Sequence, residues 1–253
     1  MKHQLTTLLL VLNAALGLYA QGPTGAGRAA GPPPTAKAAA PFDMTGYWVS
    51  IVSEDWRWRM FPNKGDYAGV PLNPDGRKVA DAWDPGKDQA AGEQCRGYGA
   101  VAVMRNPGRF HITWRDDQTM KVEADSGTQT RLFEFANPQR QGGDWQGASK
   151  AEWQFQPSGG RGAAPASPRA GSLKVVTAKL KPGYLRRNGV PYSANATLTE
   201  YYDLVTEANG DTYLVLTSKL EDPTYLTDPM ITAAHFKKQA NAAGWNLTPC
   251  ALR

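Results

Sequence analysis

The stretch from Arg109 to Phe135, RFHITWRDDQTMKVEADSGTQTRLFEF, decides the fold class of this chain. Apolar side chains alternate with polar ones in three successive runs, which carry Phe110, Ile112 and Trp114, then Met120, Val122 and Ala124, then Phe133 and Phe135. A period of two places such residues on one face of a strand. Asp116-Asp117 and Ser126-Gly127 separate the runs and are typical of turns. The stretch therefore predicts three antiparallel strands joined by short turns.

Similar patterns occur on both sides of this stretch. The sequence predicts about nine strands, at residues 47–53, 109–115, 119–125, 128–135, 150–155, 173–180, 197–205, 211–220 and 230–237. Asn209-Gly210 tolerates positive φ at both positions and so favours a two-residue hairpin between two of them. Because most connections are short, we expect a mainly β fold with an antiparallel meander. Rolling into a barrel would remove its exposed edges, and a β-sandwich is the alternative.

A short helical insert is expected after the first strand. Asn73 is a suitable N-cap, and Pro74 occupies the first helical position, where its missing N–H costs nothing. One face of this helix is predicted to carry Val79, Ala82 and Trp83. A second helical turn is expected at residues 88–94.

The N-terminal segment predicts export. Lys2 and His3 precede an apolar run from Leu8 to Leu18, which has the length of a signal-peptide core and is too short to span a bilayer. We expect cleavage after Ala20, no membrane span, and a secreted or periplasmic protein. The predicted organisation is a signal peptide at 1–20, a flexible Gly/Ala/Pro leader at 21–40, and a single β domain at 41–253 with a disordered loop at 157–171.

The positive charge of the chain lies in the segments predicted to be flexible or removed. The sequence has 28 basic and 23 acidic residues, a net charge of +5 at pH 7. Five of the basic residues are Lys2 in the signal peptide, Arg28 and Lys37 in the leader, and Arg161 and Arg169 in the predicted loop. The other 23 basic residues are balanced by the 23 acidic residues. A nucleic-acid binder carries its excess charge on a folded face, so we expect no nucleic-acid partner.

Cys95 and Cys250 are the two cysteines of the chain. An isolated pair in an exported protein predicts a disulfide, which here would tie the C-terminus to an early segment. Free thiols or metal ligands are the alternative, and no CxxC spacing or nearby histidine supports them.

Gly46, Tyr47 and Trp48, at the start of the first predicted strand, resemble the Gly-x-Trp signature of lipocalins. A disulfide linking the C-terminus to an earlier strand is also similar to lipocalins. This resemblance implies a lipocalin-like or calycin-like barrel whose lumen takes a small ligand. The helical insert after the first strand departs from the lipocalin order, in which the main helix comes last.

A second resemblance covers roughly residues 95–250. Its main elements are Gln94-Cys95, Trp145-Gln146-Gly147, Arg187–Ser193 and Glu221–Thr227 followed by Pro229. In this pattern the chain is similar to a large uncharacterised family of secreted bacterial proteins. That family often has histidine at the position of Tyr192 and lacks the loop at 157–171. The resemblance supports secretion and implies no activity.

His111 and His235 are the histidines that remain after export, and both fall on strands opposite an apolar set. Side chains on that face point either to solvent or into a lumen. In a lumen, the two histidines with Glu123, Glu200 or Asp203 would suit a metal ion or an acid–base pair. No HxH or HExxH spacing is present. We therefore predict no metal and no cofactor, and two unrelated surface histidines are the simpler interpretation.

Candidate ligand contacts come from aromatic and charged side chains. Tryptophan and arginine alternate in Trp56-Arg57-Trp58-Arg59-Met60, which favours packing of both tryptophans in the core. The alternative is a pocket rim, at which Trp58 is the candidate for ligand contact. Arg131 is a candidate buried cation facing Glu123 or Glu200, and ordinary cross-strand ion pairs explain it equally. The candidate ligand-binding residues are Trp48, Trp58, His111, Arg131, Glu200, Tyr201 and His235. No catalytic residue is assigned.

Three functions fit this sequence. The first is a periplasmic or secreted barrel that binds a small hydrophobic or aromatic ligand in its lumen. The second is a non-catalytic envelope interaction module with a filled core. The third is a lumenal acid–base enzyme of the hydratase, isomerase or cyclase type. No GxSxG or phosphate-binding motif supports catalysis, and a filled core would argue against the first and third functions.

Overall fold

A computed structural model describes residues 33–52, 62–136, 138, 141–155 and 170–252. Contacts divide the chain into two units, residues 1–33 and 34–253, and the second unit is described below. Trp58, the signal peptide and nearly all of the predicted loop at 157–171 lie outside the described residues. No helix in the described ranges is long and apolar enough to cross a membrane.

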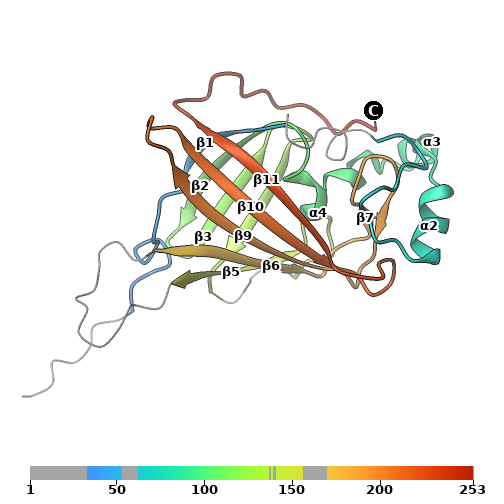
Figure 1. Ribbon diagram of the computed structural model, residues 1–253, viewed down its shortest axis with the longest axis horizontal. Helices are drawn as coiled ribbons and strands as arrows, with labels where there is room; N and C mark the ends of the chain where they lie inside the picture. Colours follow the sequence, from blue (N-terminus) through green and yellow to red (C-terminus); the bar gives the residue numbers. More distant parts are fainter. Residues whose placement is uncertain (1–32, 53–61, 137, 139–140, 156–169, 253) are drawn as a thin grey trace, which may run out of the picture. The chain divides into compact units, whose positions relative to one another are not determined.

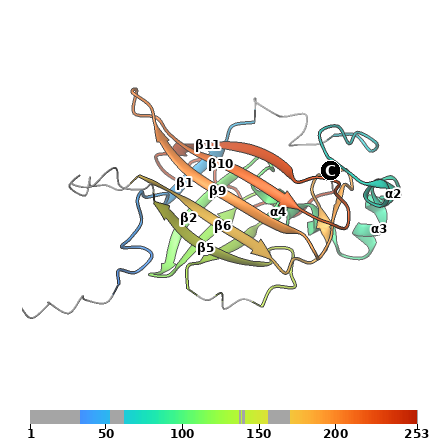
Figure 2. The ribbon, with the colours of Figure 1, turned by 60° about the horizontal axis from the view of Figure 1, so that its bottom comes forward.

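Nine strands close into a barrel in the order β1-β11-β10-β9-β6-β5-β4-β3-β2, and β2 pairs again with β1 (Figures 1 and 2). The strands are β1 (Gly46–Ser50), β2 (Arg109–Asp116), β3 (Thr119–Ala124), β4 (Gln129–Glu134), β5 (Ala148–Phe155), β6 (Gly171–Ala178), β9 (Thr197–Thr206), β10 (Thr212–Glu221) and β11 (Met230–Gln239). Their positions agree with those of the nine predicted strands. The prediction of a barrel is confirmed, and the alternative of a β-sandwich is wrong.

One pair of strands departs from the antiparallel meander. β4 and β5 run parallel, with Phe133 opposite Ser149, whereas all other neighbours in the barrel are antiparallel. An odd number of strands cannot alternate in direction all the way round a closed ring. One parallel pair is therefore required, and the long connection through residues 135–147 allows it.

Short helices lie between β1 and β2, as the sequence predicts, and they cover one end of the barrel (Figure 1). The helices are α2 (Pro74–Asp81), α3 (Pro85–Ala90), the 3-10 helix η1 (Gln94–Tyr98) and α4 (Ala100–Val103). The small hairpin of β7 (Gly183–Tyr184) and β8 (Pro191–Tyr192) packs with them. We call this assembly the cap. Its side chains share an apolar core with Leu198, Leu220 and Met230 at the ends of β9, β10 and β11.

The N-terminus of α2 is built as the sequence predicts, but its buried face is different. The side chain of Asn73 accepts a hydrogen bond from the backbone N–H of Gly76 at 2.8 Å. Gly76 and Ala80 are buried, whereas Val79, expected on the apolar face, is 39% exposed. The reason is close packing, because a Cβ at Gly76 would lie 2.6 Å from the carbonyl oxygen of Tyr225.

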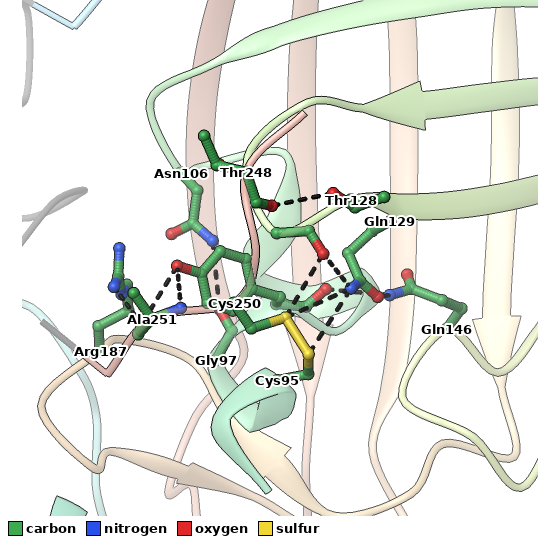
Figure 3. Close-up of a disulfide and its surroundings, with 12 residues drawn as sticks. Cys95, Gly97, Asn106, Thr128, Gln129, Gln146, Arg187, Thr248, Cys250 and Ala251 are labelled. Atoms are coloured by element: carbon green, nitrogen blue, oxygen red, sulfur yellow. Dashed lines mark hydrogen bonds between the residues drawn. A yellow bond between two sulfur atoms is a disulfide. The ribbon is translucent and has the colours of Figure 1, made fainter. Parts of the chain in front are cut away.

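The predicted disulfide joins Cys95 of η1 to Cys250, with the Cα atoms 5.2 Å apart (Figure 3). Hydrogen bonds fasten the C-terminal segment on either side of it. Thr128 donates from its hydroxyl to the carbonyl oxygen of Thr248 at 2.9 Å, and the N–H of Ala251 donates to the hydroxyl of Tyr98 at 3.1 Å. The C-terminus is therefore attached both to the cap and to the turn between β3 and β4.

Residues 34–44 cross the end of the barrel away from the cap, which we call the mouth. The indole N–H of Trp153 donates to the carbonyl oxygen of Ala36 at 2.8 Å, and the N–H of Lys37 donates to that of Asp117 at 3.1 Å. Met44 is fully buried in the main core. Residues 34–40, expected to belong to the flexible leader, therefore contact the barrel.

Candidate functional site

The barrel interior holds an ion pair between two of the predicted residues. Arg131 of β4 donates to the two carboxylate oxygens of Glu200 of β9 at 2.9 and 2.5 Å. Both side chains are buried, with exposed fractions of 2% and 1%. Because β5 and β6 separate β4 from β9, the pair reaches across the lumen instead of along the wall. The two parallel contacts form the strong bidentate arrangement of guanidinium and carboxylate.

Neighbouring polar side chains complete this interior cluster. Tyr202 donates to Glu200 at 3.1 Å, and Arg131 also donates to Thr177 at 3.3 Å, which shares a bond of 2.7 Å with Ser149. Burial alone would lower the pKa of Arg131, but the charge of Glu200 and its hydrogen bonds to Arg131 raise it above its usual value. Burial, then the charge of Glu200, raises the pKa of Tyr202 well above its usual value. Arg131 thus stays charged and Tyr202 stays protonated at neutral pH.

Apolar side chains from every strand fill the rest of the interior. Trp48 of β1 is fully buried, and its indole N–H donates to the carbonyl oxygen of Met44 at 2.9 Å. The same core contains Phe110, Ile112, Met120, Val122, Ala124, Phe133, Ala151, Leu173, Val175, Tyr202, Leu214, Leu216, Ala234 and Phe236. The predicted position of the ligand, in the lumen, is therefore occupied by protein side chains, and Trp48 acts as a core residue.

His111 lies on the outer wall of the barrel. Its ring stacks on that of Tyr47, its partner on β1, with centroids 4.1 Å apart, and Trp245 packs edge-on against both rings. Its Nδ1 atom lies 3.4 Å from Glu123, which also accepts from Lys121 at 2.9 Å. This group is a packed surface cluster rather than part of a lumen.

His235 and Tyr201 also lie on the outer wall, each with different neighbours. His235 of β11 borders an open cavity of about 400 Å³ together with Val205 and Tyr213. Tyr201 of β9 lies opposite Lys174 of β6 and Thr217 of β10. An acid–base enzyme in the lumen would require the two histidines to lie close together there. They do not, because both lie on the outer wall. Within the described ranges, no three His, Cys, Asp or Glu side chains are grouped so as to hold a metal ion.

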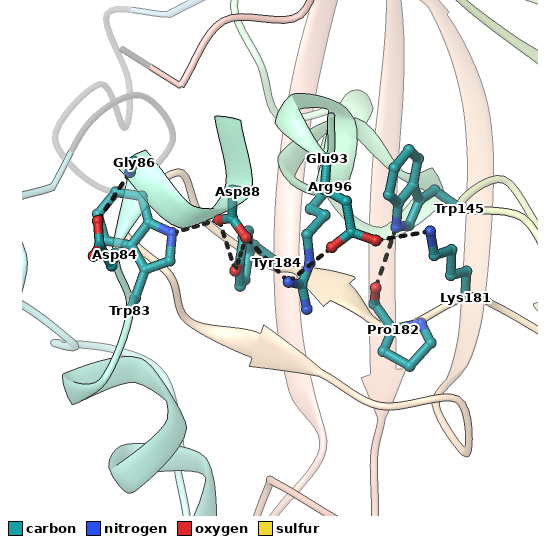
Figure 4. Close-up of polar contacts among 10 residues, drawn as sticks. All are labelled: Trp83, Asp84, Gly86, Asp88, Glu93, Arg96, Trp145, Lys181, Pro182 and Tyr184. Carbon is teal, nitrogen blue, oxygen red and sulfur yellow. Dashed lines mark hydrogen bonds and ion pairs between the residues drawn. The ribbon is translucent and has the colours of Figure 1, made fainter. Parts of the chain in front are cut away.

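A second polar cluster lies in the cap (Figure 4). Asp88 is buried and accepts from Trp83 at 3.0 Å, from Tyr184 at 2.8 Å and from Arg96 at 3.1 Å. Burial, then the bond to Asp88, raises the pKa of Tyr184 above its usual value. The adjoining cavity measures about 10 Å³, which is room for one water at most. This cluster fastens the cap and leaves no space for a ligand.

The larger cavity at the mouth is the candidate functional site. It measures about 570 Å³ and lies between residues 37–45 and the end of β2, and we call it the mouth pocket. Phe42 and Trp114 supply its aromatic surface, and Lys37 and Asp43 supply its charges. Residues Ala40, Thr45 and Thr113 complete the lining.

An aromatic chain supports the mouth pocket from below. Phe42 contacts Trp153 with centroids 5.4 Å apart, Trp153 contacts Phe135 at 5.2 Å, and Phe135 contacts Trp114 at 5.5 Å. These rings pack on the main core, so the pocket has a rigid apolar floor. The sequence places Trp114 on an apolar strand face but contains no signal that joins it to Lys37 or Asp43.

Comparisons with protein-family models, with curated proteins and with solved structures found no match. The class that the fold defines is thus a closed nine-strand β-barrel with a helical cap, a disulfide and a filled interior. The function has to be argued from the geometry of the chain itself.

Proposed function

We propose that this protein is a secreted barrel protein that binds a small, partly apolar ligand in the mouth pocket and not in the lumen. The observation that carries the proposal is a cavity of about 570 Å³ with two aromatic side chains and only two charged ones. Small-molecule sites are typically about 300–1,000 Å³ in volume, mostly apolar, and carry a few polar groups that orient the ligand.

The pocket suits a flat or aromatic ligand with a polar end. Phe42 and Trp114 offer ring faces and edges, and their own packing against the core keeps them from collapsing into the space. Lys37 and Asp43 stand at the rim, where one cation and one anion can orient a polar group. The indole N–H of Trp153 donates to the carbonyl oxygen of Ala36, and the backbone N–H of Lys37 donates to that of Asp117, so both residues are held against the barrel.

Secretion is the second part of the proposal. The Cys95–Cys250 disulfide supports it, because disulfides persist in oxidising compartments outside the cytosol. The predicted signal peptide and the resemblance to secreted bacterial proteins point the same way. Detection of the mature chain, cut after Ala20, in the periplasm or medium of an expressing cell checks this part.

Titration with N-phenyl-1-naphthylamine, a neutral aromatic dye that brightens in apolar sites, tests the ligand site. Thr113→Trp fills the pocket from its outer-wall side, and Thr217→Trp adds the same bulk to the wall at β10 as a matched control. We expect saturable binding that weakens about tenfold or more, a change of about 1.4 kcal/mol, in Thr113→Trp alone. Equal binding by both variants, or none by the original protein, contradicts the proposal.

The filled interior favours one other function, the non-catalytic envelope interaction module. A barrel without a lumenal ligand acts through its surface, and its packed core then serves only stability. The same titration separates the two functions, because an interaction module has no small-molecule site for the dye to saturate.

A further inference from the structure

Another cavity lies on the outer wall of the barrel over β5 and β6. It measures about 470 Å³, and we call it the lysine pocket. Its polar groups are Lys150, Glu152, Lys174 and Lys179, and its apolar surface includes Ala148 and Val176. No sequence pattern singles out this group, because its members come from two strands, from the turn after β6 and, with Pro138, from the connection between β4 and β5.

The strand register places these side chains on one face. Lys150 lies opposite Val176, and Glu152 lies opposite Lys174, in the antiparallel pair of β5 and β6. The intervening residues, such as Ala151, are buried in the barrel core. The strand residues of the pocket therefore belong to the wall, whose geometry is set by regular hydrogen bonding, and Pro138 and Lys179 complete the lining from outside the strands.

The charges of the lysine pocket are unbalanced. Lys174 is paired with Glu152 at 3.1 Å. Lys150 and Lys179 have no carboxylate at ion-pair distance in the part of the chain that the structure describes. Two positive charges thus remain beside an apolar surface, an arrangement that complements an anion with an apolar body.

The backbone at Lys179 has an unusual conformation. Its φ of +56° lies in the left-handed region, which glycine adopts more easily than lysine. The N–H of Gly143 donates to the carbonyl oxygen of Lys179 at 2.7 Å and holds the turn in this form. What the lysine side chain adds at this position is a positive charge at the edge of the pocket.

We propose that the lysine pocket binds a small organic anion with an aliphatic tail, of the class of medium-chain monocarboxylates. The carboxylate is held by Lys150 and Lys179, and the tail lies on Val176 and Ala148. Three lysines against one carboxylate leave a net excess of two positive charges, which suits a monoanion, whereas a nucleic acid or other polyanion requires a longer basic face. This site is separate from the mouth pocket in its strands, its residues and its ligand class.

Calorimetric titration of the mature, disulfide-bonded protein with octanoate tests the proposal. Acetate supplies the charge without the tail, and 1-octanol supplies the tail without the charge. We expect octanoate to bind saturably and both controls to bind about tenfold or more weakly. Absence of saturable octanoate binding, or equal binding of 1-octanol, overturns the proposal.

Two variants locate the site. Lys150→Gln with Lys179→Gln removes the proposed contacts, and Lys121→Gln with Lys219→Gln removes the same charge elsewhere on the outer wall. We expect octanoate affinity to fall about tenfold in the first variant and less than about twofold in the second. Equal losses in both variants would indicate a general charge effect and refute the site. Thermal unfolding of each variant verifies that the barrel is intact, and the dye titration of the mouth pocket remains an independent test.

Discussion

Replacing Glu200 with leucine should destabilise the barrel by about 3–5 kcal/mol, the usual cost of removing one partner from a buried ion pair. Arg131 would lose two charge-assisted hydrogen bonds, worth about 1.5–3 kcal/mol each, in a buried environment. Tyr202 would lose its acceptor in the same variant. The guanidinium cannot escape this cost by losing a proton, because arginine stays charged in proteins.

Replacing Arg131 with methionine should cost less than Glu200→Leu, and the cost should depend on pH. The remaining carboxyl group can be buried in its neutral form by taking up a proton. In the unfolded chain a glutamate is ionised above about pH 4.3, so folding of this variant takes up a proton at neutral pH. When the native state binds more protons than the unfolded state, stability falls as pH rises. We therefore expect Arg131→Met to be more stable at pH 5 than at pH 8, relative to the original protein.

Urea denaturation followed by tryptophan fluorescence, with the disulfide intact, measures these free energies of unfolding. The double variant, with both groups apolar, should recover most of the loss, because each single variant strands one buried polar group. Glu152→Leu, which removes a half-exposed partner from the outer-wall pair with Lys174, is the matched control and should cost no more than about 1 kcal/mol. A Glu200→Leu cost as small as the control, or strictly additive single costs, would refute the account of a tightly coupled interior pair.

Three further perturbations test other parts of the fold. Reduction of Cys95–Cys250, which closes a loop with a sequence separation of 155, should cost about 2–4 kcal/mol and lower the melting temperature by about 4–16 °C in a thermal scan with a thiol reductant. Gly189→Ala should cost more than Gly210→Ala in denaturation, because both positions have positive φ but only at Gly189 would the new Cβ meet Trp83, at 2.2 Å; the open site should cost about 1–2 kcal/mol. Stability should fall above pH 10, since a tyrosine whose folded pKa is raised stabilises the fold below its unfolded value of about 10 and loses that contribution as the pH rises through the folded value. For Tyr67, whose pKa burial and then Asp81 raise to about 12, this window is pH 10–12, and circular dichroism with tyrosinate absorbance checks whether unfolding and ionisation coincide.

The strands of this barrel could be predicted because their signal is local. Phe110 and Ile112 alternate with His111 and Thr113 in the sequence, and in the structure the first pair is buried while the second lies on the outer wall. The parallel pair of β4 and β5 follows from the odd number of strands in a closed ring and from the long connection between these two strands. The alternation of apolar and polar residues carries no information on either. The disulfide was predictable because the chain has two cysteines and its N-terminal segment predicts export.

The candidate sites were not predictable from pattern, because they join residues that are distant in the chain. The sequence places Lys37 in a flexible leader. In the structure, the indole of Trp153 donates to the carbonyl oxygen of Ala36 and holds that segment at the mouth. The same limit applies to the buried face of α2, where the structure places Gly76. An apolar count favours Val79, but close approach to Tyr225 selects the residue without a side chain.

The buried pair explains why the predicted ligand residues do not form one site. A barrel that encloses a bidentate pair together with Tyr202 and Thr177 fills its lumen with a hydrogen-bonded network, in which Nε of Arg131 alone lacks a partner among the described residues of this cluster. Inserting a ligand there would break Arg131 from Glu200 and cost about as much as the substitutions described above. Ligands are thus expected where the barrel leaves space at no such cost, at the mouth and on the outer wall. In this chain the interior provides the rigid frame, and both proposed binding sites lie outside it.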